Sequence, residues 1–275
     1  MKRRYHLLII DPQNDFCDLP PPAAPALPVP GAHQDMLRLA RLIEQGGAGV
    51  TDITVTLDSH HRYDVAHPTF WQTADGAAPA PFTQIAAADV RAGRYLPRDA
   101  SALPRVLSYL DTLEAAGRYQ LMVWPVHCEI GSWGHNVHDA VRAAYNAWEE
   151  QRHAVVAKVG KGANPWTEHY SAVMAEVPDP ADPASQLNRE LIASLALADT
   201  IYITGEAGSH CVKATTEHIA DQIDPRKLVL VTDCMSPVIG FEAQYLAFAQ
   251  ALQQRGARLA ASGEVLQEFL ANAEH

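Results

Sequence analysis

Short apolar runs alternate along the chain with longer segments of helical periodicity. The runs are rich in β-branched and aliphatic residues and are four to six residues long, which is typical of buried strands. They span residues 7–10, 53–57, 121–124, 154–159, 200–204 and 228–232. Helical spacing of about 3.6 residues is clearest over residues 36–43, 191–197 and 245–252. This alternation predicts an α/β fold with three layers, in which helices cover both faces of a six-stranded, mostly parallel sheet.

Two segments interrupt this alternation. Residues 19–31 are rich in proline and alanine, and residues 72–119 mix glycines and prolines with no clear period. We interpret both as loop insertions in one domain that spans residues 1–275. Loops of this kind lie over the carboxyl ends of parallel strands, where ligands bind. The longer insertion could be a lid, an oligomer contact or the mark of a particular substrate.

Composition and charge exclude several classes of protein. Hydrophobic residues make up 48% and charged residues 19%, and the net charge of -11 argues against a nucleic-acid surface. The basic residues at the N-terminus are followed by an apolar run that Asp11 ends too early for an export signal. Basic clusters and long apolar spans that would favour a membrane are lacking. The oligomeric state stays open, with a homo-oligomer as one alternative.

The four cysteines are widely spaced along the chain. They are Cys17, Cys128, Cys211 and Cys234. Because this spacing is not that of a disulfide framework, we expect reduced thiols and a cytoplasmic protein.

Polar or reactive residues follow most of the predicted strands. Asp11, Asp58 and Lys161 end or follow three of them, Trp124 leads into His127, and Cys211 comes shortly after a fifth. Since parallel strands end at the same edge of a sheet, we expect these side chains to converge there. The sequence therefore predicts a functional site at this edge.

The segment before Cys211 is suited to a nucleophile. A strand breaks at Gly205, and Cys211 then begins a predicted helix, whose free N–H groups favour a thiolate. Lys161 could supply a cation and Asp11 a base, although Lys158 is an alternative to Lys161. A buried cysteine can also simply pack in the core.

A metal site is predicted near the same edge. Asp58 and His60 are two residues apart and point to the same side of an extended segment, and His67 and His127 add two imidazoles. One carboxylate with three imidazoles suits a divalent ion, with zinc favoured and iron or manganese as alternatives.

These motifs together resemble the nicotinamidase branch of the isochorismatase-like cysteine hydrolases. The resemblance covers about residues 5–260, and it rests on the following motifs. They are residues 11–17 (Asp-Pro-Gln-Asn-Asp-Phe-Cys), residues 27–32, residues 58–60 with His67, residues 124–128 (Trp-Pro-Val-His-Cys), Lys161 with residues 170–172, and residues 205–212 (Gly-Glu-Ala-Gly-Ser-His-Cys-Val).

The resemblance implies a function and a role for each matching residue. It implies hydrolysis of nicotinamide to nicotinic acid and ammonia through a cysteine thioester, in pyridine nucleotide salvage. The implied catalytic residues are Asp11, Lys161 and Cys211, with Ala207 and Cys211 in the oxyanion hole after a cis peptide between Glu206 and Ala207. The implied substrate-binding residues are Phe16, Trp124 and Tyr170, and the implied metal ligands are Asp58, His60, His67 and His127.

Three alternatives remain at this stage. The same triad could act on another small amide or on a ureido compound. A metal-bound hydroxide could be the nucleophile instead of Cys211. The pocket could also bind a pyridine ligand without turnover.

Overall fold

Strand β1 (Tyr5–Ile10) is buried along its whole length and lies inside a six-stranded sheet. The computed structural model describes residues 2–274. The strands follow the order β10-β9-β8-β1-β2-β7, and every pair is parallel. The other strands of this sheet are β2 (Asp52–Asp58), β7 (Ala157–Lys161), β8 (Thr200–Gly205), β9 (Leu228–Val231) and β10 (Arg258–Ala260). The predicted parallel α/β sheet is confirmed.

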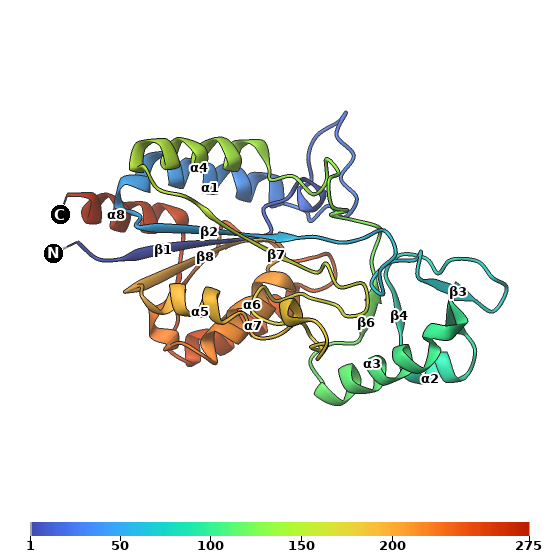
Figure 1. Ribbon diagram of the computed structural model, residues 1–275. Coiled ribbons are helices and arrows are strands. Elements are labelled where there is room, and N and C mark those ends of the chain that lie inside the picture. The colour runs from blue at the N-terminus through green and yellow to red at the C-terminus, as the bar shows by residue number, and fades with distance from the viewer. Residues whose placement is uncertain (1, 275) are drawn as a thin grey trace.

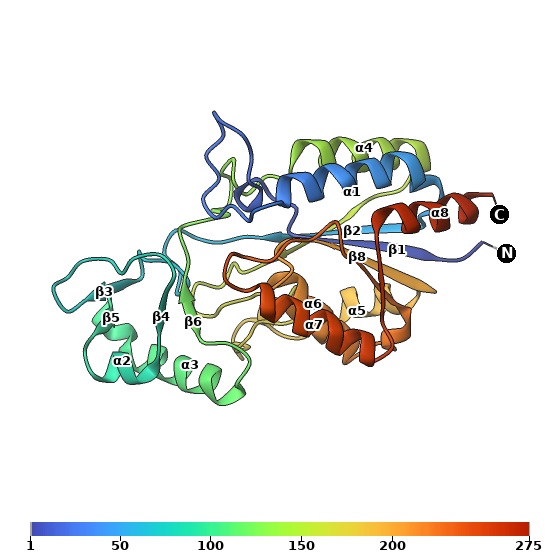
Figure 2. The same cartoon turned by 180° about the vertical axis from the view of Figure 1, so that it is seen from behind.

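Helices cover both faces of this sheet (Figure 1; Figure 2). One layer contains α1 (Ala32–Gly46), α4 (Asp139–Arg152) and α8 (Ser262–Ala273). The other contains α5 (Arg189–Ala196), α6 (Cys211–Ala220) and α7 (Glu242–Gln254). The predicted three-layer arrangement is therefore confirmed. Among residues 2–274, no helix has the length and apolar character needed to cross a bilayer.

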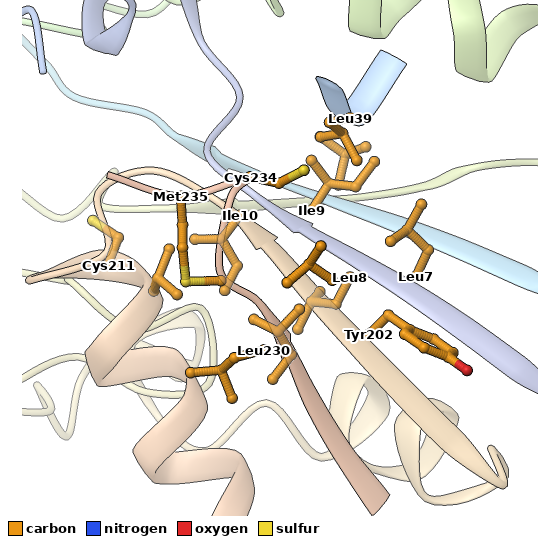
Figure 3. Packing of buried hydrophobic residues seen from close by; sticks show 14 of the residues in the cluster. Leu7, Leu8, Ile9, Ile10, Leu39, Tyr202, Cys211, Leu230, Cys234 and Met235 are labelled. Carbon is orange, nitrogen blue, oxygen red and sulfur yellow. The ribbon is translucent and has the colours of Figure 1, made fainter. Parts of the chain in front are cut away.

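The main core forms where β1 meets both helical layers. Leu7 and Ile9 point to the face that α1 covers, whereas Leu8 and Ile10 point to the opposite face (Figure 3). All four side chains are fully buried. A strand with helices on both sides must be apolar on both faces, which explains why this run shows no alternation of polar and apolar residues.

The structure differs from the strand predictions at two predicted strands and adds a strand that was not predicted. Residues 121–124 do not join the main sheet: β6 (Leu121–Val123) pairs with β4 (Thr83–Ile85) in a separate antiparallel ribbon. The sixth strand of the sheet is β10, which has only three residues and an exposed arginine, and so leaves no apolar run in the sequence. The strand predicted over residues 154–159 is β7, at residues 157–161. Because β7 is a largely exposed edge strand, the apolar pattern of the sequence does not mark its bounds.

The interpretation of residues 72–119 as a loop was also wrong. This segment forms most of a lobe with β3 (Trp71–Thr73), β5 (Tyr95–Pro97), α2 (Ala87–Arg91) and α3 (Leu103–Ala116), together with β4 and β6. The lobe has its own hydrophobic core, which includes Trp71, Leu110 and Val123. Its strands have three residues each, too few to show a period in the sequence. Residues 19–31 are a loop, as predicted.

The lobe lies beside the carboxyl ends of the central strands (Figure 1). Residues that follow β6 therefore reach the same edge of the sheet, although β6 is outside it. The expected convergence at this edge is preserved by the packing of the lobe and not by the sheet alone.

One buried histidine should make stability depend on pH. His6 is 1% exposed, its Nε2 lies 2.8 Å from the Thr54 hydroxyl, and burial lowers its pKa to about 4. The unfolded chain binds a proton at His6 below about pH 6.5, so stability falls as the pH decreases from 6.5 towards 4. We expect His6 alone to account for a loss of about 2 kcal/mol between pH 7 and pH 5.

Urea unfolding of wild type and His6→Leu at these two pH values tests this expectation. The variant should lose less stability on acidification by about that amount. His153→Asn, at an exposed histidine, is the matched control. An equal pH dependence in wild type and His6→Leu would contradict the expectation.

Candidate active site

Four of the predicted site residues lie at the carboxyl edge of the sheet. Asp58 and Lys161 are the last residues of neighbouring strands and pair directly with each other in the register of β2 and β7. Asp11 follows β1, and Cys211 begins α6 shortly after β8. After β1 the chain continues to β2 on one side of the sheet, and after β8 it continues to β9 on the other side. The carboxyl ends of β1 and β8 therefore flank the topological switch point, which is where α/β proteins bind ligands.

Gly205 allows β8 to end close to β1. Its φ is 111°, and a β-carbon at this position would lie 1.9 Å from the carbonyl oxygen of Ile10. Any other residue would therefore separate the two strand ends. This close approach places the turn before Cys211 beside Asp11.

The Lys161 ammonium group is the centre of the site. Its Nζ lies 2.9 Å from Asp11 Oδ2, 2.9 Å from Asp58 Oδ1 and 3.5 Å from Cys211 Sγ, and it also donates to the His169 carbonyl at 3.0 Å. Burial alone would lower the pKa of Lys161, but Asp11, Asp58 and Cys211 together raise it well above its usual value. Lys161 is therefore a fixed cation, and the other two members of the predicted triad, Asp11 and Cys211, lie beside it.

Asp11 is held by Thr56 on the neighbouring strand. The Thr56 hydroxyl donates to Asp11 Oδ1 at 2.5 Å and accepts from the Asp11 N–H at 3.1 Å. Burial raises the pKa of Asp11, although Lys161 opposes this effect. A buried carboxylate with a raised pKa is a better proton acceptor than an exposed one.

Cys211 is buried with its sulfur at the pocket. Burial raises the pKa of the thiol well above its usual value, and Lys161 acts in the opposite direction. At rest the sulfur therefore keeps its proton until a base accepts it.

The backbone around Cys211 offers two free donors. Within residues 2–274, neither the Ala207 N–H nor the Cys211 N–H bonds to another protein group. The expected cis peptide between Glu206 and Ala207 is present. Unpaired N–H groups beside a nucleophile suit an oxyanion that develops on the substrate.

Three imidazoles converge next to this triad. Donor atoms of His60, His67 and His127 all lie within 4.8 Å of one another. Each ring has its Nδ1 near another acceptor: Asp64 Oδ2 at 3.0 Å for His60, the His61 carbonyl at 3.1 Å for His67, and the Pro125 carbonyl at 2.8 Å for His127. This arrangement leaves the three Nε2 atoms for an ion, as in protein metal sites.

Asp58 joins the imidazoles to the triad. Its Oδ2 lies 3.1 Å from His60 Nε2 and 3.3 Å from His127 Nε2, while its Oδ1 contacts Lys161. Burial would raise the pKa of Asp58, but His60 and Lys161 lower it well below its usual value. The residues present therefore fit a divalent cation with one carboxylate and three imidazole ligands.

A narrow aromatic pocket opens above Cys211 and Asp58. Phe16, Trp124 and Tyr170 line it, as expected, together with Ala207 and His127. The Trp124 indole N–H donates to the Tyr170 hydroxyl at 3.1 Å, which fixes both rings. The walls suit a flat ring, and the floor holds the reactive groups.

Three residues that contact the site or line the pocket were not predicted from the sequence. The Gln13 side chain donates to the Asp58 carbonyl and accepts from the Asp58 N–H, both at 2.7 Å, so it fixes the position of Asp58. Asp64 orients His60. Glu168 lines the pocket with one buried oxygen that bonds to no residue among 2–274, and burial raises its pKa to about 7. Gln13 lies within the first motif, but no periodicity pointed to Asp64 or Glu168.

Other candidates lie away from the pocket. Lys158 contacts Glu149 at the surface, so it is not the cation of the site. Glu206, which was considered as a pocket residue, is buried next to Asp35 and Ser236. Cys17, Cys128 and Cys234 are buried free thiols.

The fold is similar to those of solved nicotinamidases, pyrazinamidases and isochorismatase-like hydrolases. The Acinetobacter baumanii nicotinamidase pyrazinamidase aligns with a TM-score of 0.64 and 18% identity, over 96% of this chain and 98% of that protein. A pyrazinamidase of Pyrococcus horikoshii in complex with zinc aligns with a TM-score of 0.55 and 15% identity, over 94% and 99%. An isochorismatase-like hydrolase from Alkaliphilus metalliredigens aligns with a TM-score of 0.53 and 16% identity, over 97% and 99%.

The chain has the isochorismatase-like hydrolase fold. No family model matches the sequence, and no curated protein matches it. Since identities of 15–18% establish a fold alone, the activity has to be argued from the site.

The hydrogen bond from His60 to Asp64 should matter for metal affinity. We expect Asp64→Ala to weaken binding of zinc to metal-stripped protein by about 10- to 100-fold, because the His60 ring loses the acceptor that orients it. Competition with a coloured chelator measures this change. Asp139→Ala, at a surface carboxylate, is the control. An unchanged zinc affinity in Asp64→Ala would show that these imidazoles do not form the metal site.

Proposed function

We propose that this protein is a cysteine amidohydrolase that converts nicotinamide to nicotinic acid and ammonia. The observation that carries this proposal is the position of Lys161, within 3.5 Å of Asp11, Asp58 and Cys211, next to an aromatic pocket that Asp58 and Cys211 line. In this proposal a flat pyridine ring lies between Phe16 and Trp124, with its carboxamide near Cys211. Nicotinic acid would then enter pyridine nucleotide salvage.

The first half of the reaction forms a thioester. Asp11 accepts the Cys211 thiol proton while the sulfur attacks the amide carbonyl carbon, and the Ala207 and Cys211 N–H groups hold the oxygen that becomes negative. The carbon–nitrogen bond then breaks as Asp11 returns the proton to the leaving nitrogen, which departs as ammonia. Lys161 stabilises the negative charge on the sulfur and on Asp11 throughout.

The second half releases the acid. A water molecule attacks the thioester carbonyl as Asp11 accepts its proton, and the carbon–sulfur bond breaks as the sulfur regains a proton. A divalent ion held by Asp58, His60, His67 and His127 would supply Lewis-acid chemistry towards a nitrogen or oxygen donor in the pocket. The zinc in the Pyrococcus horikoshii structure supports zinc as that ion.

The neighbouring proposal keeps the triad but changes the substrate to another small amide or a ureido compound. The observation that favours it is the lobe of residues 72–119, which has its own folded core and places the Phe82 ring 5.8 Å from the Trp124 ring of the pocket. Ammonia release from nicotinamide distinguishes the two substrates directly.

Replacement of the nucleophile should abolish turnover. We expect Cys211→Ala to lower the rate of ammonia release from nicotinamide at least about a thousand-fold, because no other group can form the thioester. Cys234→Ala, at a buried thiol outside the site, should keep the wild-type rate. Rapid acid quench followed by intact-mass measurement should show wild-type chains that carry one pyridinecarbonyl group. A Cys211→Ala variant that retains its rate, with no such adduct in wild type, would favour a metal-bound hydroxide as the nucleophile.

The two lysines of β7 provide a second test. We expect Lys161→Met to lower kcat/KM for nicotinamide at least about a hundred-fold, because the negative charge on Cys211 and Asp11 loses its partner. Lys158→Met should change kcat/KM less than about two-fold, since its ammonium group lies at the surface. Removal of a buried charge also destabilises a fold, so circular dichroism should accompany the assay. A folded Lys161→Met variant with wild-type kcat/KM would contradict the assigned role.

A further inference from the structure

A second and wider cavity of about 370 Å³ lies next to the aromatic pocket. We call it the outer chamber. Gln84, Arg118, Tyr119 and Gln120 line it on the side of the lobe, and Phe241 and Gln244 line it on the opposite side. The segment that was interpreted as a loop thus builds about half of this chamber.

The outer chamber shares two residues with the aromatic pocket. Tyr170 and His210 line both cavities. The His210 ring lies 5.4 Å from the Tyr170 ring and 4.6 Å from the Phe241 ring, measured between centroids. A ligand held over Cys211 therefore has these two side chains between its ring and the outer chamber.

The lobe also reaches the aromatic pocket itself. Phe82 is 52% exposed, has a φ of 67°, and places its ring 5.8 Å from that of Trp124 at an angle of 83°. An exposed aromatic residue with a left-handed backbone is uncommon and is found more often at binding sites than elsewhere. Phe82 offers an apolar face beside a wall of the pocket.

The charged groups of the outer chamber are already paired. Arg118 contacts Glu217 at 2.9 Å and lies beside His218, and Glu114 accepts the Ala87 N–H. By contrast, Gln84 and Gln120 are exposed, and their carboxamides make no hydrogen bond to another residue within residues 2–274. The free polar groups are thus neutral amides, which donate and accept hydrogen bonds but do not favour an ion.

We propose that the outer chamber binds the distal part of a substrate longer than nicotinamide, namely an aromatic carboxamide whose ring carries an uncharged, hydrogen-bonding substituent. This inference rests on the proposed function, because the carboxamide must lie over Cys211. The substituent passes Tyr170 and His210, packs against Tyr119 and Phe241, and bonds to the carboxamides of Gln84 and Gln120.

Three probes test this proposal with purified, zinc-loaded protein. They are nicotinamide itself, nicotinamides with a neutral hydroxyethoxy group at different ring carbons, and the matching carboxymethoxy compounds, which carry a negative charge. Ammonia release gives kcat/KM for each. We expect at least one neutral extended probe to match or exceed nicotinamide, and its charged counterpart to be a poorer substrate.

A double variant, Gln84→Leu with Gln120→Leu, separates the outer chamber from the catalytic site. We expect it to lower kcat/KM for the best neutral probe about ten-fold, from two lost hydrogen bonds, and to change kcat/KM for nicotinamide less than about two-fold. Gln253→Leu with Gln254→Leu, at exposed positions of α7, is the matched control and should change neither value.

The outcomes distinguish this inference from the proposed function. If nicotinamide is hydrolysed but no extended probe is, or if the double variant treats both substrates alike, the outer chamber binds no substrate and only this inference is wrong. If the extended probe is hydrolysed and nicotinamide is not, nicotinamide is the wrong substrate while the inference stands. If no probe releases ammonia, direct binding of the neutral probe to Cys211→Ala decides: binding that the double substitution weakens supports the chamber, and no binding overturns it.

Discussion

The buried Lys161 ammonium group holds the site together. A charge removed from water is costly unless opposite charges and hydrogen bonds compensate for it. Here Asp11 and Asp58 each lie 2.9 Å from Nζ, and the His169 carbonyl accepts a further hydrogen bond. Because the two carboxylates and the lysine come from three neighbouring strands, their attraction also fixes the ends of β1, β2 and β7 relative to one another.

This arrangement explains how a neutral thiol can react. Two carboxylates face one ammonium group, so the surroundings of Cys211 are not positive enough to hold a thiolate at rest, and burial raises its pKa further. In the proposed mechanism the sulfur becomes nucleophilic when Asp11 accepts its proton, and burial, which raises the pKa of Asp11, favours that transfer. In this mechanism, proton transfer to Asp11 accompanies attack on the substrate.

Asp58 links two chemical units that would otherwise be independent. One of its oxygens contacts Lys161 and the other faces His60 and His127. A cation bound by the imidazoles would therefore change the electrostatic field at Lys161 and, through it, at Cys211. Gln13, which bonds to both backbone groups of Asp58, keeps this shared carboxylate in place.

The lobe gives the pocket a wall with a stable structure. It has a hydrophobic core separate from the main one, and its last strand leads directly into Trp124. The Trp124 indole then bonds to Tyr170, which belongs to the main domain. Trp124 packs in the main core, and the lobe contacts it from outside, where the Phe82 ring lies 5.8 Å from the Trp124 ring.

Much of this could be predicted from local patterns along the chain. The apolar runs and the helical periods predicted the parallel sheet and its three layers, because central strands and amphipathic helices have distinctive spacings. The residues that follow the strands predicted Asp11, Asp58, Lys161 and Cys211 as neighbours, because the geometry of a parallel sheet brings strand ends together. The spacing of Asp58 and His60, with His67 and His127, added the three histidines, whereas Phe16 and Trp124 were implied by the resemblance to a known family.

Only the tertiary structure decided the rest, because it depends on contacts between distant segments. Strand β10 and the strands of the lobe are too short to show a period, so their pairing partners define them. Glu168 and Asp64 gain their roles from burial and from the ring or cavity that they face, neither of which is encoded in local spacing. The sequence by itself therefore determined which groups meet at the edge of the sheet, and tertiary packing of distant segments determined the pocket above them.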